Sequence, residues 1–124
     1  MVEPLIAAQA VPDASGVPFS PRFGDVYHAA QGALAQAHHV FLRGNGLPER
    51  WRGRERFAVC ETGFGLGLNF LALWHAWRED PARSAHLDVV SIEAHPFERE
   101  RLALWLGQLV PPALRSLADE LLAQ

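Results

Sequence analysis

The sequence predicts an α/β fold built on parallel strands, and three features of residues 57–109 support this prediction. Two short apolar runs, at 57–60 and 87–92, each end at a glutamate, as buried strands do when they reach a polar edge. A glycine-rich turn and the apolar segment 70–80 lie between them. A second segment with apolar residues at helical spacing, 97–109, follows the second run. The order strand, turn, helix, strand, helix requires a parallel pair of strands joined by a crossover helix.

The segments outside this unit are shorter. Residues 5–8 and 17–19 are apolar runs separated by turn-forming residues, which predicts an N-terminal β-hairpin or arm. Residues 29–42 contain good helix formers and predict a helix. After two prolines, residues 114–122 have the apolar spacing of a final amphipathic helix.

The chain has 124 residues, which is enough for one domain with a modest core. Two parallel strands have two faces to cover and are not stable alone, so the unit belongs to a larger sheet. We therefore divide the chain into 1–56, an N-terminal arm, helix and loop, and 57–124, the first half of a parallel α/β domain.

Composition excludes several classes of function. All 11 basic residues are arginine, which removes Schiff-base chemistry, a lysine general base and a lysine phosphate loop. The net charge of −3 excludes a uniformly basic nucleic-acid coat. The single cysteine, Cys60, lies in a predicted strand and is expected to be a buried core residue rather than a nucleophile, and the six histidines are too scattered for a metal site. Without a cationic leader or an apolar run of about 20 residues, we expect a soluble cytoplasmic protein with no membrane partner.

The glycine-rich turn has the spacing Glu61-x-Gly63-x-Gly65-x-Gly67. A glycine turn between a strand and a helix lets a ligand lie against the backbone. A triphosphate loop requires a lysine, and a dinucleotide site requires Gly-x-Gly-x-x-Gly, so neither fits. An acidic residue followed by alternating glycines is the pattern of S-adenosylmethionine-dependent methyltransferases.

The chemistry of that ligand agrees with the acidic residues. Glu61 can hold the ammonium of the methionine part, and Glu93, at the end of the next strand, can accept hydrogen bonds from both ribose hydroxyls. Two plainer interpretations stay open: the glycines only shape a tight turn, and Glu93 is an ordinary solvated strand end. The arginines at 50, 52, 54 and 56 favour a solvated loop over a phosphate-binding site.

Four blocks of the sequence resemble the methyltransferase domain of the bacterial tRNA 5-methylaminomethyl-2-thiouridine biosynthesis proteins. They occur in the order found in that family, and the resemblance extends over about residues 17–124. The blocks are PRFGDVY (21–27), VFLRGNGLPERW (40–51), ETGFGLGLNF (61–70) and SIEAHP (91–96).

The resemblance implies a Rossmann-like S-adenosylmethionine-dependent methyltransferase fold, preceded by the short N-terminal β-hairpin or arm. The implied activity is methylation of the aminomethyl group on the wobble uridine of certain tRNAs, with tRNA as partner and S-adenosyl-L-methionine as methyl donor. In many bacteria this domain is fused to a flavin-dependent oxidase. The implied cofactor-binding residues are Glu61, Gly63, Gly65, Gly67, Asn69, Glu93 and Tyr27. Residues 22–27 would border the same pocket.

Later motifs of the family are not found before Gln124, so the chain resembles the N-terminal half of an incomplete methyltransferase fold. The amine would attack the methyl group in line, with catalysis mostly by positioning, and no catalytic residue is identified. The alternatives are an inactive fragment or a non-enzymatic nucleotide-binding module. No residue here supports the flavin oxidase function itself.

Overall fold

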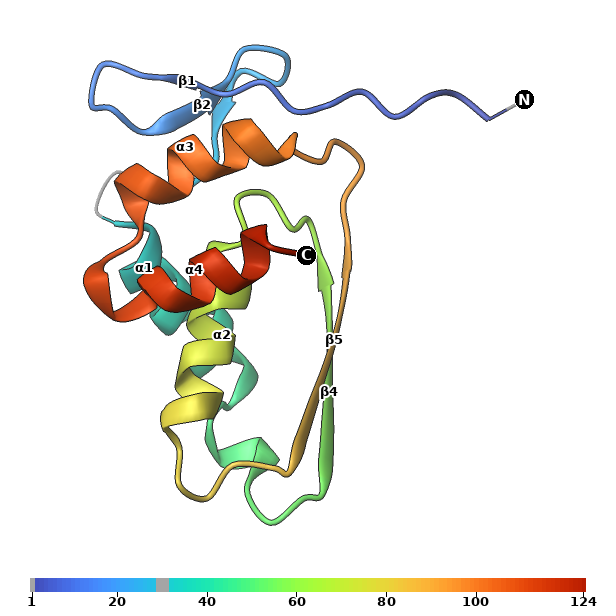
Figure 1. Ribbon diagram of the computed structural model, residues 1–124, viewed down its shortest axis with the longest axis vertical. Helices are drawn as coiled ribbons and strands as arrows, with labels where there is room; N and C mark the ends of the chain where they lie inside the picture. The colour runs from blue at the N-terminus through green and yellow to red at the C-terminus, as the bar shows by residue number, and fades with distance from the viewer. Residues whose placement is uncertain (1, 29–31) are drawn as a thin grey trace.

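The computed structural model describes residues 2–28 and 32–124 and contains two small sheets and several helices (Figure 1). The α-helices and strands, in chain order, are β1 (Val11–Pro12), β2 (Pro18–Ser20), β3 (Asp25–Val26), α1 (Ala33–Gln36), β4 (Arg56–Thr62), α2 (Leu68–Glu79), β5 (His86–Ile92), α3 (Arg99–Leu109) and α4 (Arg115–Leu122).

Strands β4 and β5 are parallel, as the sequence predicts. Their register runs from Arg56 opposite His86 to Thr62 opposite Ile92, and α2 connects them. The α/β class and the order of elements are therefore confirmed. Both glutamates of the predicted site come at the same end of this sheet, because parallel strands align their carboxyl ends.

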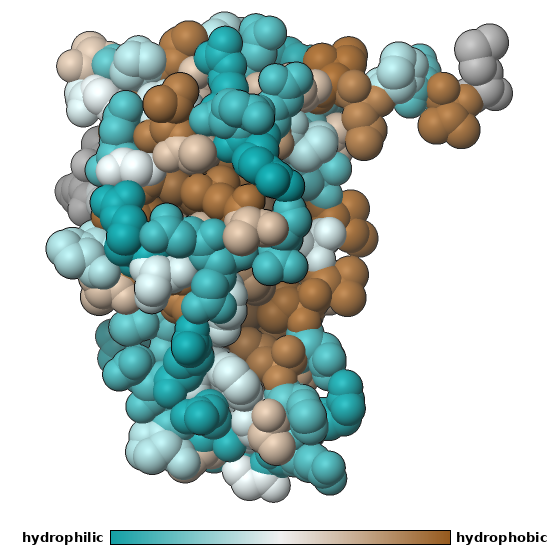
Figure 2. Space-filling view, in the orientation of Figure 1, coloured by the Kyte–Doolittle hydropathy of each residue, from teal (hydrophilic) through white to brown (hydrophobic). Residues whose placement is uncertain are grey.

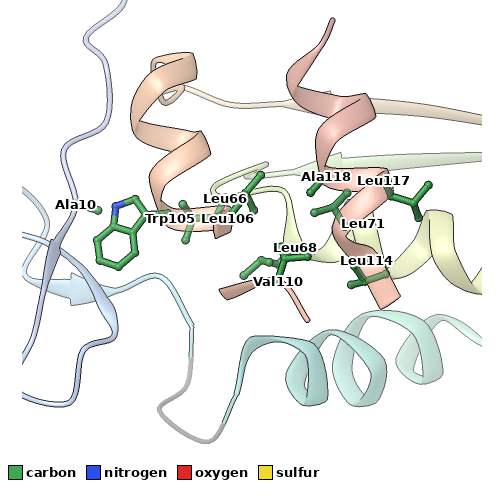
Figure 3. Packing of buried hydrophobic residues seen from close by; sticks show 10 residues of the cluster. All are labelled: Ala10, Leu66, Leu68, Leu71, Trp105, Leu106, Val110, Leu114, Leu117 and Ala118. Atoms are coloured by element: carbon green, nitrogen blue, oxygen red, sulfur yellow. The ribbon is translucent and has the colours of Figure 1, made fainter. Parts of the chain in front are cut away.

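Helix α2 lies between two hydrophobic cores. Leu68 and Leu71 belong to a core with α3, α4 and Ala10 of the N-terminal arm (Figure 3). Ala72 and Leu73 belong to a second core that includes buried residues from the segment 37–51. A helix with a core on both sides must be apolar nearly all round, which explains its sequence.

The two faces of the β4–β5 sheet differ in burial. On the inner face, Val59 and Val89 pack against the second core. On the outer face, Val90 and Ile92 are 61% and 62% exposed, and Figure 2 shows hydrophobic surface along these strands. The expectation that Cys60 is buried is wrong, because its side chain alternates onto the outer face and is exposed.

The N-terminal segment forms a three-stranded antiparallel sheet in the order β1-β2-β3. The carboxylate of Asp13 accepts hydrogen bonds from the backbone N–H groups of Ser15 and Val17 and so shapes the hairpin turn. The predicted hairpin is present, but residues 5–8 are not its first strand. The backbone N–H of Ala8 instead donates to the carbonyl of Pro96, which ties the arm to the loop after β5.

The helix predicted over 29–42 begins at Ala33 and continues as a π-helix from Ala37 to Leu42. Residues 29–31 of that prediction lie outside the described residues. The predicted final helix is α4, which follows a 3-10 turn over Pro112–Leu114. Within 2–28 and 32–124, the helices are too short and too polar to cross a membrane.

Candidate functional site

The turn between β4 and α2 depends on its glycines. Gly63, Gly65 and Gly67 have φ angles of +80°, +55° and +75°, in the left-handed region that residues with a Cβ rarely adopt. A side chain at position 67 would also clash, because a Cβ there would lie 2.8 Å from the Phe64 ring. The backbone N–H of Gly63 donates to the carbonyl of Ile92 at 2.7 Å, so the turn is fixed to the end of β5.

A cavity of about 250 Å³ opens over this turn. Four of the predicted site residues line it together: Tyr27, Gly63, Gly65 and Asn69. The helical segment 33–45 also lines the cavity and contributes two residues with amide side chains, Gln36 and Asn45. Sequence reasoning missed both amides, because only the packing of that segment against the turn places them there.

Glu93 follows β5 and supports the turn from the side. One carboxylate oxygen accepts the backbone N–H of Gly65 at 2.7 Å, and the other accepts the N–H of His95 at 3.3 Å. Glu93 lines a neighbouring cavity of about 200 Å³ rather than the first one. Its carboxylate is therefore attached to the glycine turn instead of extending freely into solvent.

Glu61 is the buried acid of the site, with only 5% of its surface exposed. The Ser91 hydroxyl donates a hydrogen bond to its Oε1 at 2.8 Å, whereas Oε2 is buried with no partner among the described residues. Burial raises the pKa of Glu61, the Ser91 hydrogen bond opposes this rise, and the charge of Glu93 adds to it. Glu61 lines neither of these two cavities.

Tyr27 stands between the two cavities and lines both. Its ring lies 5.2 Å from that of Phe97, centroid to centroid, and 3.8 Å from the position that a Cβ on Gly65 would occupy. Burial raises the pKa of Tyr27, and the nearby charge of Glu93 raises it further, against a hydrogen bond with Ser20. The phenol therefore stays protonated at neutral pH and can act as a hydrogen-bond donor.

The arginine run after residue 49 lies at the other end of β4. Arg52 pairs with Asp80 at 3.0 Å, Arg56 pairs with Asp88 at 3.1 Å, and the Arg50 guanidinium lies 5.7 Å from the Phe57 ring. These contacts give three of the four arginines structural partners far from the glycine turn. In the described part of the chain, no group of three or more histidine, cysteine or acidic residues could hold a metal ion.

Comparisons with known proteins agree with the sequence blocks, although no protein-family model matches. The chain is 56% identical, over 100% of its length, to the tRNA 5-methylaminomethyl-2-thiouridine biosynthesis bifunctional protein MnmC of Cupriavidus metallidurans, and covers 18% of that protein. It is 63% identical, over 87% of its length, to MnmC of Azoarcus sp., and covers 17% of it. The chain thus spans less than a fifth of the length of these curated relatives.

Among solved structures, the crystal structure of MNMC2 from Aquifex aeolicus matches 86% of this chain and 38% of its own, with a TM-score of 0.61 and 23% identity. At that identity the likeness concerns the fold alone. The high identity to the curated relatives is the stronger finding. It confirms the resemblance expected from the sequence, and the chain belongs to the family of bacterial tRNA 5-methylaminomethyl-2-thiouridine biosynthesis proteins, of which it spans a segment.

Proposed function

We propose that this chain is the cofactor-binding half of a Rossmann-like methyltransferase domain. It would use S-adenosyl-L-methionine to methylate the aminomethyl group of a modified wobble uridine in tRNA, in the cytoplasm. The observation that carries the proposal is the buried, unpartnered oxygen of Glu61 beside a glycine turn. The names of the relatives support tRNA as the substrate class.

The residues present fit this cofactor. A buried carboxylate oxygen without a partner is costly, and an ammonium donor would satisfy it. The space where a Cβ on Gly63 would lie is open to 4 Å, so a ligand can approach the backbone there. Each oxygen of Glu93 accepts one backbone N–H and keeps a second lone pair, which can accept a ribose hydroxyl.

Bound S-adenosylmethionine supplies an electrophilic methyl group on its sulfonium. The chain would contribute binding and orientation: Glu61 would hold the ammonium directly or through water, and Glu93 would hold the ribose while it fixes Gly65. Tyr27 closes the wall between the two cavities and remains protonated, so it orients a ligand as a donor and does not remove a proton. Catalysis of this kind comes mostly from positioning.

Calorimetric titration with S-adenosylmethionine tests the binding site. We expect the wild-type chain to bind, and Glu61→Gln to bind at least about tenfold more weakly, because a hydrogen bond between charged groups is replaced by a neutral one. The exposed Glu100→Gln is the matched control and should bind as the wild type does. A folded wild-type chain that does not bind the cofactor would contradict the proposal.

A methyl-transfer assay with tritiated cofactor and undermodified tRNA tests the activity. Incorporation of label into tRNA supports an enzyme. Cofactor binding without incorporation would instead favour the alternative of a non-enzymatic nucleotide-binding module.

A further inference from the structure

An exposed aromatic side chain stands beside the proposed cofactor site. Phe23 lies in the turn between β2 and β3 and is 62% exposed. Cavities of about 200 and 180 Å³ share Ser20, Phe23, Tyr27 and His95 as wall residues. Figure 1 shows that this N-terminal sheet lies toward the carboxyl ends of β4 and β5, where the glycine turn is. Phe23 is therefore a largely exposed aromatic residue in the wall of two cavities that also contain Tyr27.

The turn that carries Phe23 is held by hydrogen bonds, and its ring contacts a second aromatic ring. The Ser20 hydroxyl accepts the N–H of Phe23 at 3.3 Å, and the Ser20 carbonyl accepts the N–H of Gly24 at 2.8 Å. The His95 ring lies 5.2 Å from the Phe23 ring at an interplanar angle of 46°. Nδ1 of His95 lies 3.1 Å from the carbonyl oxygen of Ile6, which fixes that ring as well. The aromatic pair is therefore prepared for a ligand before one arrives.

The surrounding groups indicate what kind of ligand fits. The Arg22 guanidinium lies 5.4 Å from the centre of the Phe23 ring. Asp25, in the wall of the larger cavity, presents a carboxylate acceptor. Each cavity is smaller than the roughly 300–1,000 Å³ that drug-sized ligands occupy, so a single ring system is the right size. Aromatic faces and arginine planes are the surfaces on which unpaired RNA bases stack.

We infer that Phe23, flanked by Arg22 and His95, is a stacking platform for a base of single-stranded RNA next to the methyl-donor site. This inference rests on the proposed function and names how its RNA substrate docks. Stacking uses the exposed ring, the Asp25 carboxylate accepts a base N–H group, and the Arg22 cation attracts a neighbouring phosphate. The RNA backbone supplies a phosphate for Arg22, whereas S-adenosylmethionine has no phosphate, so the dependence of affinity on salt separates the two ligands.

Fluorescence anisotropy with a labelled oligouridylate, without cofactor, tests the platform. We expect Phe23→Ala and Phe23→Leu to weaken binding about tenfold, because the second variant keeps the apolar bulk but loses the aromatic face. Phe23→Tyr should retain wild-type affinity. Arg22→Gln should weaken binding and reduce its salt dependence by roughly one phosphate contact. Leu104→Ala, at a site 69% exposed on α3, is the control and should change nothing.

The outcomes separate the two proposals. If oligouridylate fails to bind, or binds equally to Phe23→Ala, the platform is refuted whether or not the cofactor binds. If Phe23→Ala weakens calorimetric binding of S-adenosylmethionine but leaves RNA affinity unchanged, the cavity holds the adenine of the cofactor and the inference is wrong. RNA binding that depends on Phe23 in a chain that does not bind S-adenosylmethionine would support the platform while refuting the methyltransferase.

Discussion

Carboxylates at the two ends of the β4–β5 sheet differ in their hydrogen-bond partners and in the direction in which their pKa is shifted. At the amino end, Asp80 accepts hydrogen bonds from the indole of Trp51 at 2.8 Å, the guanidinium of Arg52 at 3.0 Å and the backbone N–H of Ala82 at 2.9 Å. The first two hydrogen bonds, above all, lower the pKa of Asp80 to about 2. Donors meet both oxygens of this carboxylate.

At the carboxyl end, no ion pair with Glu61 or Glu93 is found among the described residues. Glu61 has one oxygen without a partner, and burial raises its pKa. The same chemical group is thus stabilised as an anion at one end of the sheet and destabilised at the other. The amino end thus supplies the donors that its carboxylate needs, whereas the carboxyl end leaves one oxygen of Glu61 without a partner among the described residues, and our proposed cofactor site rests on that oxygen.

Removal of the anchor at the amino end should have the largest effect on stability. Trp51 is 0% exposed, packs edge-on against Phe57 and donates to Asp80. We expect Trp51→Ala to lower the free energy of unfolding by about 3–5 kcal/mol, as large-to-small changes in a core do. Urea denaturation followed by circular dichroism measures this loss.

The milder Trp51→Phe keeps most of the ring but removes the indole donor, so it should fall between Trp51→Ala and the wild type. Leu104→Ala, on the exposed face of α3, is the control and should stay within about 0.5 kcal/mol. Equal stability of Trp51→Ala and Leu104→Ala would show that the amino end does not anchor the fold.

Acidification should shift the stability of the two ends in opposite directions. The pKa of Glu61 is higher in the folded chain than its ordinary value of 4.5, so the folded state binds that proton more tightly. Its contribution to stability therefore rises as the pH falls through the raised pKa toward 4.5. The pKa of Asp80 is lowered from 3.8 to about 2, so its contribution is complete above 3.8 and is lost as the pH falls toward 2.

Urea midpoints measured across this pH range for the wild type, Glu61→Gln and Asp80→Asn resolve the two contributions. Glu61→Gln should abolish the rise at mild acidity, and Asp80→Asn should abolish the loss at stronger acidity. If Glu61→Gln leaves the rise unchanged, another group causes it and the contrast between the two ends fails.

The order of helices and strands was predictable from the sequence, because the spacing of apolar residues and the positions of glycines determine local structure. The strands predicted at 57–60 and 87–92 are β4 and β5, extended by a few residues. The burial of Cys60 was not predictable in the same way. An apolar run indicates a strand, but only the surrounding layers decide which of its faces is covered, and here the covered face is the one with Val59.

The candidate site likewise has residues that the sequence predicted and residues that it did not. The spacing of Gly63, Gly65 and Glu93 along the chain was sufficient to bring the glycine turn and an acid together, because parallel strands end at one edge. Gln36 and Asn45 line the cavity only because a distant segment, part of it π-helical, packs against the turn. No local pattern in the sequence specifies such a contact.

The smallest expected effect on stability comes from alanine substitutions at two matched glycines, one at each end of the sheet. The pair separates the cost of backbone strain from the loss of ligand contact. Gly53 has φ +73° and Gly63 has φ +80°, and a Cβ at either position would have no atom within 4 Å. Alanine at either position should therefore cost about 1 kcal/mol of stability, from left-handed strain alone. Only Gly63→Ala should also weaken calorimetric binding of S-adenosylmethionine, because only there would the new methyl group occupy space that the ligand uses. Equal cofactor affinity of the two variants would mean that the turn does not contact the ligand, and the carboxyl end would then be another structural turn like the one at Gly53.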